Sequence, residues 1–177
     1  PPVIERVEAV RRERQVSKKA STRMLAKTPT VFGEDRQPVS RYLVMPKVSS
    51  ERRHYIPLGF LDPNHITTPT VLVIPNATLH HFGVIQSVMH MAWMRAVAGR
   101  MKSDYQYSNT IVYNNFPWPD PSDKQREVIE AAAQGVLDAR AQFPDATLAD
   151  LYDPLTMPPV LVKAHQTELD VAEAGDD

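Results

Sequence analysis

The sequence contains no cysteine and only six glycines among its 177 residues. Without cysteine, disulfide frameworks and thiolate metal sites are excluded. No glycine stands in a GxGxxG or GxxxxGK setting, so the chain has no glycine-rich phosphate loop. No apolar run reaches the ~20 residues that a membrane span requires, and the charged stretch 4–19 does not resemble a secretory signal. These absences favour a cytoplasmic protein without a membrane partner.

The six histidines show no spacing that is typical of catalysis or metal binding. His80 and His81 are adjacent, so on a helix they would point about 100° apart and could not share a metal ion. A self-contained hydrolase would have to use His54, His65 or His90 with a nearby aspartate, but no spacing of a nucleophile and a base supports such a site. The sequence therefore predicts no catalytic residue and no metal ligand in this chain.

The chain does have a pronounced asymmetry of charge, although its net charge is only −1. Residues 1–107 contain 16 Lys and Arg against 8 Asp and Glu, whereas residues 108–177 contain 4 against 13. A basic first part is typical of a face that meets nucleic acid, and an acidic last part is typical of a solvated support. Clusters of charge can equally do no more than solvate two surfaces, so composition alone leaves both interpretations open.

Hydrophobic periodicity predicts an α+β fold, in which a small, mainly antiparallel sheet is flanked by helices and followed by a helical C-terminal tail. Pro57 places its strand at an edge or at a bulge. We expect a recognition domain over residues 1–120 and a helical C-terminal segment over residues 121–177. Helices are expected at 4–27, 79–101, 122–143 and 159–172, a short turn at 148–152, and strands at 41–45, 55–61, 71–74 and 110–113.

The segment 79–101 carries apolar residues at steps of three and four, and Asn76 or Thr78 is expected to cap this helix. Its methionines are interpreted as core filling rather than as a cofactor site. A protein–protein adaptor is the alternative function, in which this Met- and Trp-bearing helix and the acidic tail dock a partner. Salt would separate the two functions, because phosphate-driven affinity falls steeply with salt and apolar docking does not.

Basic and polar residues gather in three segments, 47–53, 67–70 and 100–107. In an extended stretch, Lys102 and Asp104 would face the same way. A lysine can donate to the two acceptors of guanine in the major groove, and an aspartate can accept from the amino group of the paired cytosine. The pair could therefore read one G·C base pair. The alternative is a surface ion pair between the two side chains, worth less than ~1 kcal/mol.

Long motifs in this sequence resemble a known family. The runs QSVMHMAWMR (86–95) and GRMKSDYQYSNTIVYNNFPWP (99–119) are similar to the end of the target-recognition domain in MmeI-like, type IIL restriction–modification methyltransferases. Upstream, RYLVMPKVSSERR (41–53), PLGF (57–60) and IPN (74–76) also resemble this family. The similarity extends from about residue 1 to residue 170.

The resemblance implies that the chain belongs to a longer protein, which we call the parent polypeptide. Proteins of this type join an endonuclease domain, an S-adenosylmethionine-dependent adenine methyltransferase domain, a target-recognition domain and a helical C-terminal part. This chain would be the last two, and its start at Pro1 without a methionine is consistent with that expectation. The implied partners are double-stranded DNA and the remainder of the parent polypeptide. S-adenosylmethionine would bind in the absent methyltransferase domain and no cofactor would bind in this chain.

The resemblance also implies roles for individual residues. In the family, a pair of residues after the long helix sets one base of the recognition sequence, and Lys102 and Asp104 match that pair. The positions that resemble further base-reading residues are Gln106, Lys47, Thr68 and Thr70. Charge and location in the sequence, rather than the family match, suggest phosphate contacts by Arg41, Ser49, Arg52, Arg53 and Arg100.

Overall fold

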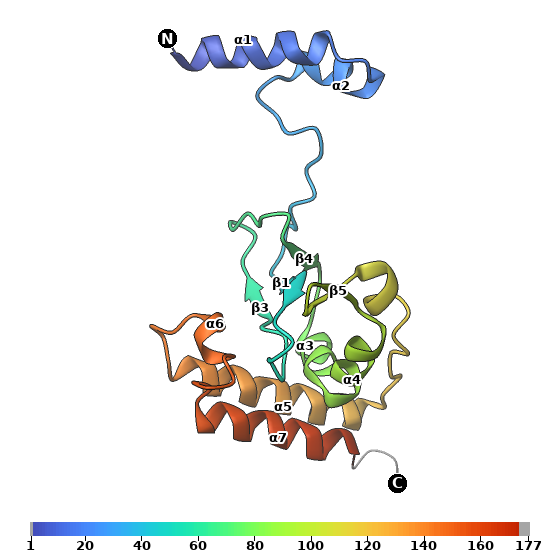
Figure 1. Ribbon diagram of the computed structural model, residues 1–177, viewed down its shortest axis with the longest axis vertical. Coiled ribbons are helices and arrows are strands. Elements are labelled where there is room, and N and C mark those ends of the chain that lie inside the picture. The colour runs from blue at the N-terminus through green and yellow to red at the C-terminus, as the bar shows by residue number, and fades with distance from the viewer. Residues whose placement is uncertain (1, 174–177) are drawn as a thin grey trace. The chain divides into compact units, whose positions relative to one another are not determined.

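The computed structural model describes residues 2–173 of the chain (Figure 1). The chain divides into two compact units, residues 1–37 and residues 38–177, which we describe separately. Residue 120, where we expect the recognition domain to end, lies within the second unit. Among the described residues, no helix combines the length and the hydrophobicity that crossing a membrane demands.

The first unit contains α1 (Pro2–Gln15), α2 (Ala20–Met24) and the 3-10 helix η1 (Leu25–Lys27). The prediction of one helix over 4–27 was wrong, because the chain leaves the helix after α1. Arg14 explains the arrangement: its guanidinium donates to the carbonyls of Leu25 (3.0 Å), Thr28 (2.8 Å) and Val31 (3.0 Å). The carbonyls of Leu25 and Thr28 also accept from the N–H groups of Thr28 and Val31 (both 3.1 Å), so the guanidinium adds charge-assisted hydrogen bonds that hold this turn against α1.

The second unit contains two small antiparallel sheets, which confirm the predicted antiparallel pairing. In the first sheet, the strand order is β3-β1-β4, so β3 lies at an edge as Pro57 predicted. The predicted strand 55–61 is shorter than expected, because the residues before β3 leave the ladder while Ile56 and Leu58 enter the core. The strands of this sheet are β1 (Tyr42–Pro46), β3 (Gly59–Leu61) and β4 (Val71–Ile74).

The second sheet has the strand order β2-β6-β5. Its strands are β2 (Val48–Ser49), β5 (Gly99–Met101) and β6 (Asp104–Gln106). Strands β5 and β6 form a hairpin in which Met101 faces Asp104, and β2 joins the hairpin by pairing Ser49 with Tyr105. This sheet positions the candidate site.

The long helix predicted over 79–101 is two helices, α3 (Leu79–Gln86) and α4 (Val88–Val97). Ser87 separates them: its backbone is extended, and its hydroxyl accepts a hydrogen bond from the His90 N–H (3.2 Å) as the N-cap of α4. Thr78, rather than Asn76, is the N-cap of α3. The last residues of the predicted helix form β5 instead.

The segment predicted as a strand at 110–113 is a π-helix, η2 (Asn109–Tyr113). Its β-branched residues suggested a strand, but a local hydrogen bond from Ile111 and a tertiary one from Trp93 favour the helix. Ser108 accepts from the Ile111 N–H (3.4 Å), and the indole of Trp93 donates to the carbonyl of Val112 (3.0 Å). The indole of Trp118 donates to the carbonyl of Tyr113 (3.2 Å), so the following proline-rich segment is a structural corner.

The C-terminal part consists of α5 (Asp123–Ala141), α6 (Leu148–Leu151) and α7 (Pro159–Glu173). Ser122 begins α5 with a capping box that it forms with Gln125. Helices α5 and α7 pack side by side, and α3 packs against α5 (Figure 1). At Gly83 in α3, a Cβ atom would lie 2.8 Å from Cγ2 of Ile129, so only glycine permits this approach. The predicted α+β fold with a helical C-terminal part is confirmed.

The methionines of the predicted long helix divide between core and surface. Met91 and Met94 are each 1% exposed, which confirms core filling for these two. Met89 is 65% exposed and Met101 is 51% exposed, so the prediction was wrong for them. The buried residues of α3 and α4 face the core, whereas Val88 (45% exposed) and Met89 lie on an exposed apolar side of α4, so the adaptor alternative stays open.

Two histidines are fully buried and form structural hydrogen bonds. His90 Nε2 lies 2.8 Å from the hydroxyl of Tyr107, and His165 Nε2 lies 2.8 Å from the hydroxyl of Tyr152. His165 also stacks on Tyr55, with a centroid distance of 4.0 Å. Burial lowers the pKa of His90 to about 4. Burial and the nearby charge of Arg140 lower the pKa of His165 to about 3.

These two histidines predict a loss of stability in acid. Because both folded pKa values lie below the usual ~6.5, the unfolded chain binds more protons as the pH falls below about 6.5. Above that pH, neither histidine lowers the free energy of unfolding. At pH 5, each of them lowers the free energy of unfolding by on the order of 2 kcal/mol. Urea unfolding at pH 7 and pH 5 measures the loss. His165→Gln should reduce it, whereas replacing the exposed His54 by Gln should not, and an equal loss in both variants would contradict the assignment.

Candidate nucleic-acid interface

The second sheet brings together the three polar segments that the sequence singled out. Lys47 is the junction: its N–H donates to the carbonyl of Thr70 (2.9 Å), and its carbonyl accepts from the N–H of Tyr107 (2.7 Å). Beyond Lys47, β2 pairs with β6 at Val48 and Gln106. We call the resulting set the polar cluster, which comprises Lys47, Thr68, Thr70, Arg100, Lys102, Asp104 and Gln106.

Lys102 occupies the first of two turn residues in the β5–β6 hairpin, with a φ of 57°. The prediction of an extended stretch through Lys102 and Asp104 was therefore wrong. A positive φ at this position of a two-residue hairpin turn favours Gly, Asn or Asp, and for lysine the conformation costs on the order of 1 kcal/mol. The turn nevertheless presents an exposed lysine at the tip of the hairpin. Strain of this kind at an exposed charged residue is typical of a functional position.

Lys102 and Asp104 form no ion pair with each other in the described part of the chain, so the ion-pair alternative does not hold. Asp104 is half-buried, and its Oδ1 accepts from the Glu51 N–H at 3.4 Å. This long contact places the carboxylate beside the loop that follows β2. The hairpin thus presents a cation at its turn and a held acceptor beside it.

Arg100 lies on β5 and is held from three directions. Its guanidinium lies 3.8 Å from the ring centroid of Tyr105, and Nη1 donates to the carbonyl of Ser103 (2.7 Å). Nη1 also lies 3.8 Å from Oε2 of Glu51. An exposed ion pair of this kind is worth less than ~1 kcal/mol, so it competes only weakly with a bound phosphate.

The other predicted phosphate contacts are distributed unevenly. Arg52 is exposed in the loop after β2, and the half-buried Arg53 follows it. Ser49 is 4% exposed, so its hydroxyl faces the interior and not a surface that could meet a phosphate. Arg41 precedes β1 at the end opposite Lys47, about 20 Å away at ~3.3 Å per residue, and its guanidinium stacks on Phe60 at 4.5 Å. The structure thus separates Arg41 from the polar cluster.

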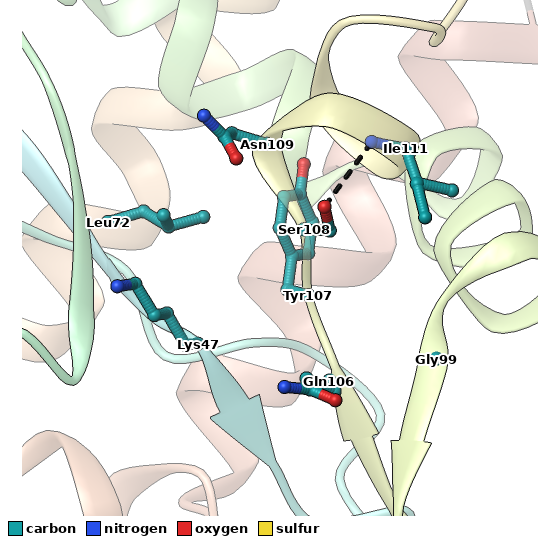
Figure 2. Close-up of a pocket in the computed structure, with 8 residues that line it drawn as sticks. All are labelled: Lys47, Leu72, Gly99, Gln106, Tyr107, Ser108, Asn109 and Ile111. Atoms are coloured by element: carbon teal, nitrogen blue, oxygen red, sulfur yellow. Dashed lines mark hydrogen bonds between the residues drawn. The ribbon is translucent and has the colours of Figure 1, made fainter.

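A surface pocket of about 380 Å³ adjoins the polar cluster (Figure 2). Lys47 and Gln106 line it, together with Asn109, which the sequence reasoning missed. Asn109 was missed because its place in the pocket depends on segments that are far apart in the sequence. The remaining lining residues are Leu72, Gly99, Tyr107, Ser108 and Ile111.

The histidines of the hydrolase alternative do not form a site. His90 is buried against Tyr107, whereas His54 and His65 are exposed on separate loops. Within residues 2–173, no group of three or more His, Asp or Glu residues could hold a metal ion. The chemistry that the site offers is hydrogen bonding by exposed amide, hydroxyl, ammonium and carboxylate groups.

The second unit is an α+β module that gathers hydrogen-bonding groups on one hairpin and the neighbouring loop. It therefore belongs to the class of recognition modules. Residues 1–120 match the sequence family described as the target recognition domain of MmeI, and residues 121–174 match the MmeI C-terminal domain. The chain belongs to the MmeI family, which confirms the resemblance seen in its motifs.

Two similar proteins illustrate the relationship. DNA methyltransferase A of Bacillus subtilis (strain 168) is 40% identical over 166 residues, which cover 94% of this chain and 19% of that protein. The solved structure of the type IIL restriction–modification enzyme MmeI in complex with DNA is 44% identical, with a TM-score of 0.87. That match covers 99% of this chain and 23% of the MmeI chain. The chain thus spans about a fifth of the length of each.

Proposed function

We propose that this chain recognises a specific sequence in double-stranded DNA and positions that DNA for a methyltransferase on the same polypeptide. The observation that carries the proposal is the polar cluster, in which three segments distant in sequence meet around Lys47. A similar protein is a DNA methyltransferase, and the similar solved structure is of an enzyme in complex with DNA.

The polar cluster has the chemistry that direct readout of the major groove requires. Lysine donates to guanine, glutamine pairs with adenine, aspartate accepts from cytosine, and threonine can contact any base. We propose that Lys102 and Asp104 read one G·C base pair and that Lys47, Thr68, Thr70 and Gln106 contribute to neighbouring positions. The two threonines support each other, since their hydroxyls lie 2.5 Å apart.

The parent polypeptide would supply the chemistry. We propose that it carries an adenine methyltransferase that uses S-adenosylmethionine and flips its target base. The cofactor would bind outside this chain. In support, both sheets of residues 2–173 are antiparallel and no glycine-rich strand-to-helix turn accompanies them. This chain would contribute no catalytic residue.

We propose that Arg52, Arg53 and Arg100 contact phosphates. Each such contact releases counterions, so log affinity falls with log salt in proportion to the number of contacts. Arg52→Ala/Arg53→Ala should weaken binding to all DNA sequences and reduce the salt slope by about 2. Electrophoretic shifts at several salt concentrations measure the slope. Lys163→Ala, an exposed cation on α7, should leave it unchanged, and an unaltered slope in the double variant would remove these residues from the interface.

The proposed function is tested by binding-site selection on a randomised duplex library with the parent polypeptide. A reproducible motif whose affinity declines log-linearly with salt is the expected result. Binding without a motif would contradict sequence recognition. Absence of DNA binding even at low salt would contradict the proposal and favour the adaptor instead.

A further inference from the structure

Two carboxamide side chains project into the pocket beside the polar cluster without a partner. Gln106 and Asn109 both line this pocket and both are exposed. Within the part of the chain that the structure describes, neither amide forms a hydrogen bond. Asn115 differs, because its amide donates to the carbonyls of Thr110 (2.9 Å) and Ile111 (3.2 Å). Asn115 therefore serves the fold, whereas Asn109 offers its full hydrogen-bonding capacity to a ligand.

The backbone at Asn109 is nevertheless firmly held. Its carbonyl accepts from the N–H of Asn114 (2.8 Å), which closes the π-helix η2. The preceding hydroxyl, that of Ser108, lies 2.9 Å from the hydroxyl of Thr110 and accepts from the N–H of Ile111 (3.4 Å). An unpaired amide on a held backbone is suited to reading a base edge, because the backbone is already ordered and binding has to fix only the side chain.

An apolar side chain accompanies this amide. Leu72, on the edge strand β4, lines the same pocket. Figure 2 shows the side chains of Asn109 and Leu72 on the same side of the chain segment 106–109, with Lys47 beyond Leu72. The wall next to the polar cluster therefore combines a donor–acceptor group with an apolar surface.

This combination matches one base pair better than the others. In the major groove an A·T pair presents the N7 acceptor and the N6 amino donor of adenine, and beside them the methyl group of thymine. An asparagine amide pairs with adenine through both groups, and an apolar side chain packs on the methyl group. A G·C pair would offer the amide no such bidentate match and would give Leu72 no methyl group to cover.

We propose that Asn109 reads the adenine of an A·T base pair from the major groove, with Leu72 against the thymine methyl group. This inference rests on the proposed function and adds a specificity-determining residue outside the polar cluster. It deepens that function by naming the base pair that the pocket selects.

The test repeats binding-site selection with the parent polypeptide and its Asn109→Ala variant. The variant should lose a preference for A·T at one position by about 10- to 100-fold and keep the rest of the motif. Asn114→Ala, which removes another exposed asparagine of the same segment, should leave the whole motif unchanged. A motif that Asn109→Ala leaves intact overturns the inference, while the proposed function stands. A wild type that selects no motif overturns both.

A base analogue gives an independent readout. At the position that Asn109→Ala relaxes, 7-deazaadenine removes the N7 acceptor and should weaken wild-type binding by about 5-fold. The same analogue should not weaken binding by Asn109→Ala, because the partner of N7 is already absent. Equal weakening of both proteins would show that another residue reads this adenine, and would overturn the assignment.

Discussion

Exchanging the two hairpin charges, as Lys102→Glu/Asp104→Arg, should invert the preference of the protein at one base pair from G·C toward C·G. Glutamate accepts from the cytosine amino group and arginine donates to both guanine acceptors, so the donor and the acceptor change places. We expect about 10- to 100-fold discrimination in each direction. Binding-site selection with the parent polypeptide measures this discrimination.

The control is Ser103→Ala, at the neighbouring turn position, which should keep the original motif. If the double variant also keeps that motif, the pair does not read a base.

The conformation of Lys102 gives this prediction a second readout. Glycine adopts a φ of 57° without strain, so Lys102→Gly should stabilise the chain by up to ~1 kcal/mol. The same variant should lose discrimination at the G·C pair. A gain in stability together with a loss of specificity would indicate that lysine is retained for its function. A lysine that served only the fold would instead lower stability when replaced.

Some elements of the fold could be predicted from the sequence, and others could not. Apolar runs bounded by polar and proline residues correctly predicted β1 and β4, and helical periodicity over 122–143 correctly predicted α5. Each of these signals is local. The break at Ser87 was missed, because the apolar pattern continues across it and only the cap geometry of α4 interrupts the helix. The hairpin turn at Lys102 was missed because it lacks the Asn-Gly or Asp-Gly signal of such turns.

The residues of the candidate site could not be predicted from local sequence patterns alone. The spacing of Lys102 and Asp104 first suggested them as a base-reading pair, and the family motifs then supported this pair and suggested Lys47 and Thr70. Spacing in the sequence could not show that these residues meet, because the contact passes through backbone hydrogen bonds between Lys47 and the β4 and β6 regions. Asn109 was beyond the reach of the sequence for the same reason, since its role depends on a pocket that several elements enclose.

Loss of Arg140 should strongly reduce the stability of the second unit. It lies on α5 and is 8% exposed. Its Nη1 donates to the carbonyl of Leu58 (2.7 Å), and its Nε donates to the hydroxyl of Tyr152 (2.9 Å). The guanidinium also faces the rings of Phe82 (5.0 Å) and Tyr152 (4.8 Å). One side chain thus joins the region of the recognition-domain match to the region of the C-terminal match.

Arg140→Met should destabilise the chain by about 3 kcal/mol. Removing a buried charge recovers part of its desolvation energy, but the Leu58 carbonyl is then left buried without its donor, and charge-assisted hydrogen bonds are lost. Because one end of this network is in α5 and the other precedes β3, the two regions should also separate more easily. Urea unfolding measures the first effect, and hydrogen exchange at α5 measures the second.

The control is Arg126→Met, which replaces an exposed arginine on the same helix and should change stability by less than ~0.5 kcal/mol. Equal effects of the two variants would mean that the recognition module does not depend on its helical C-terminal part through Arg140.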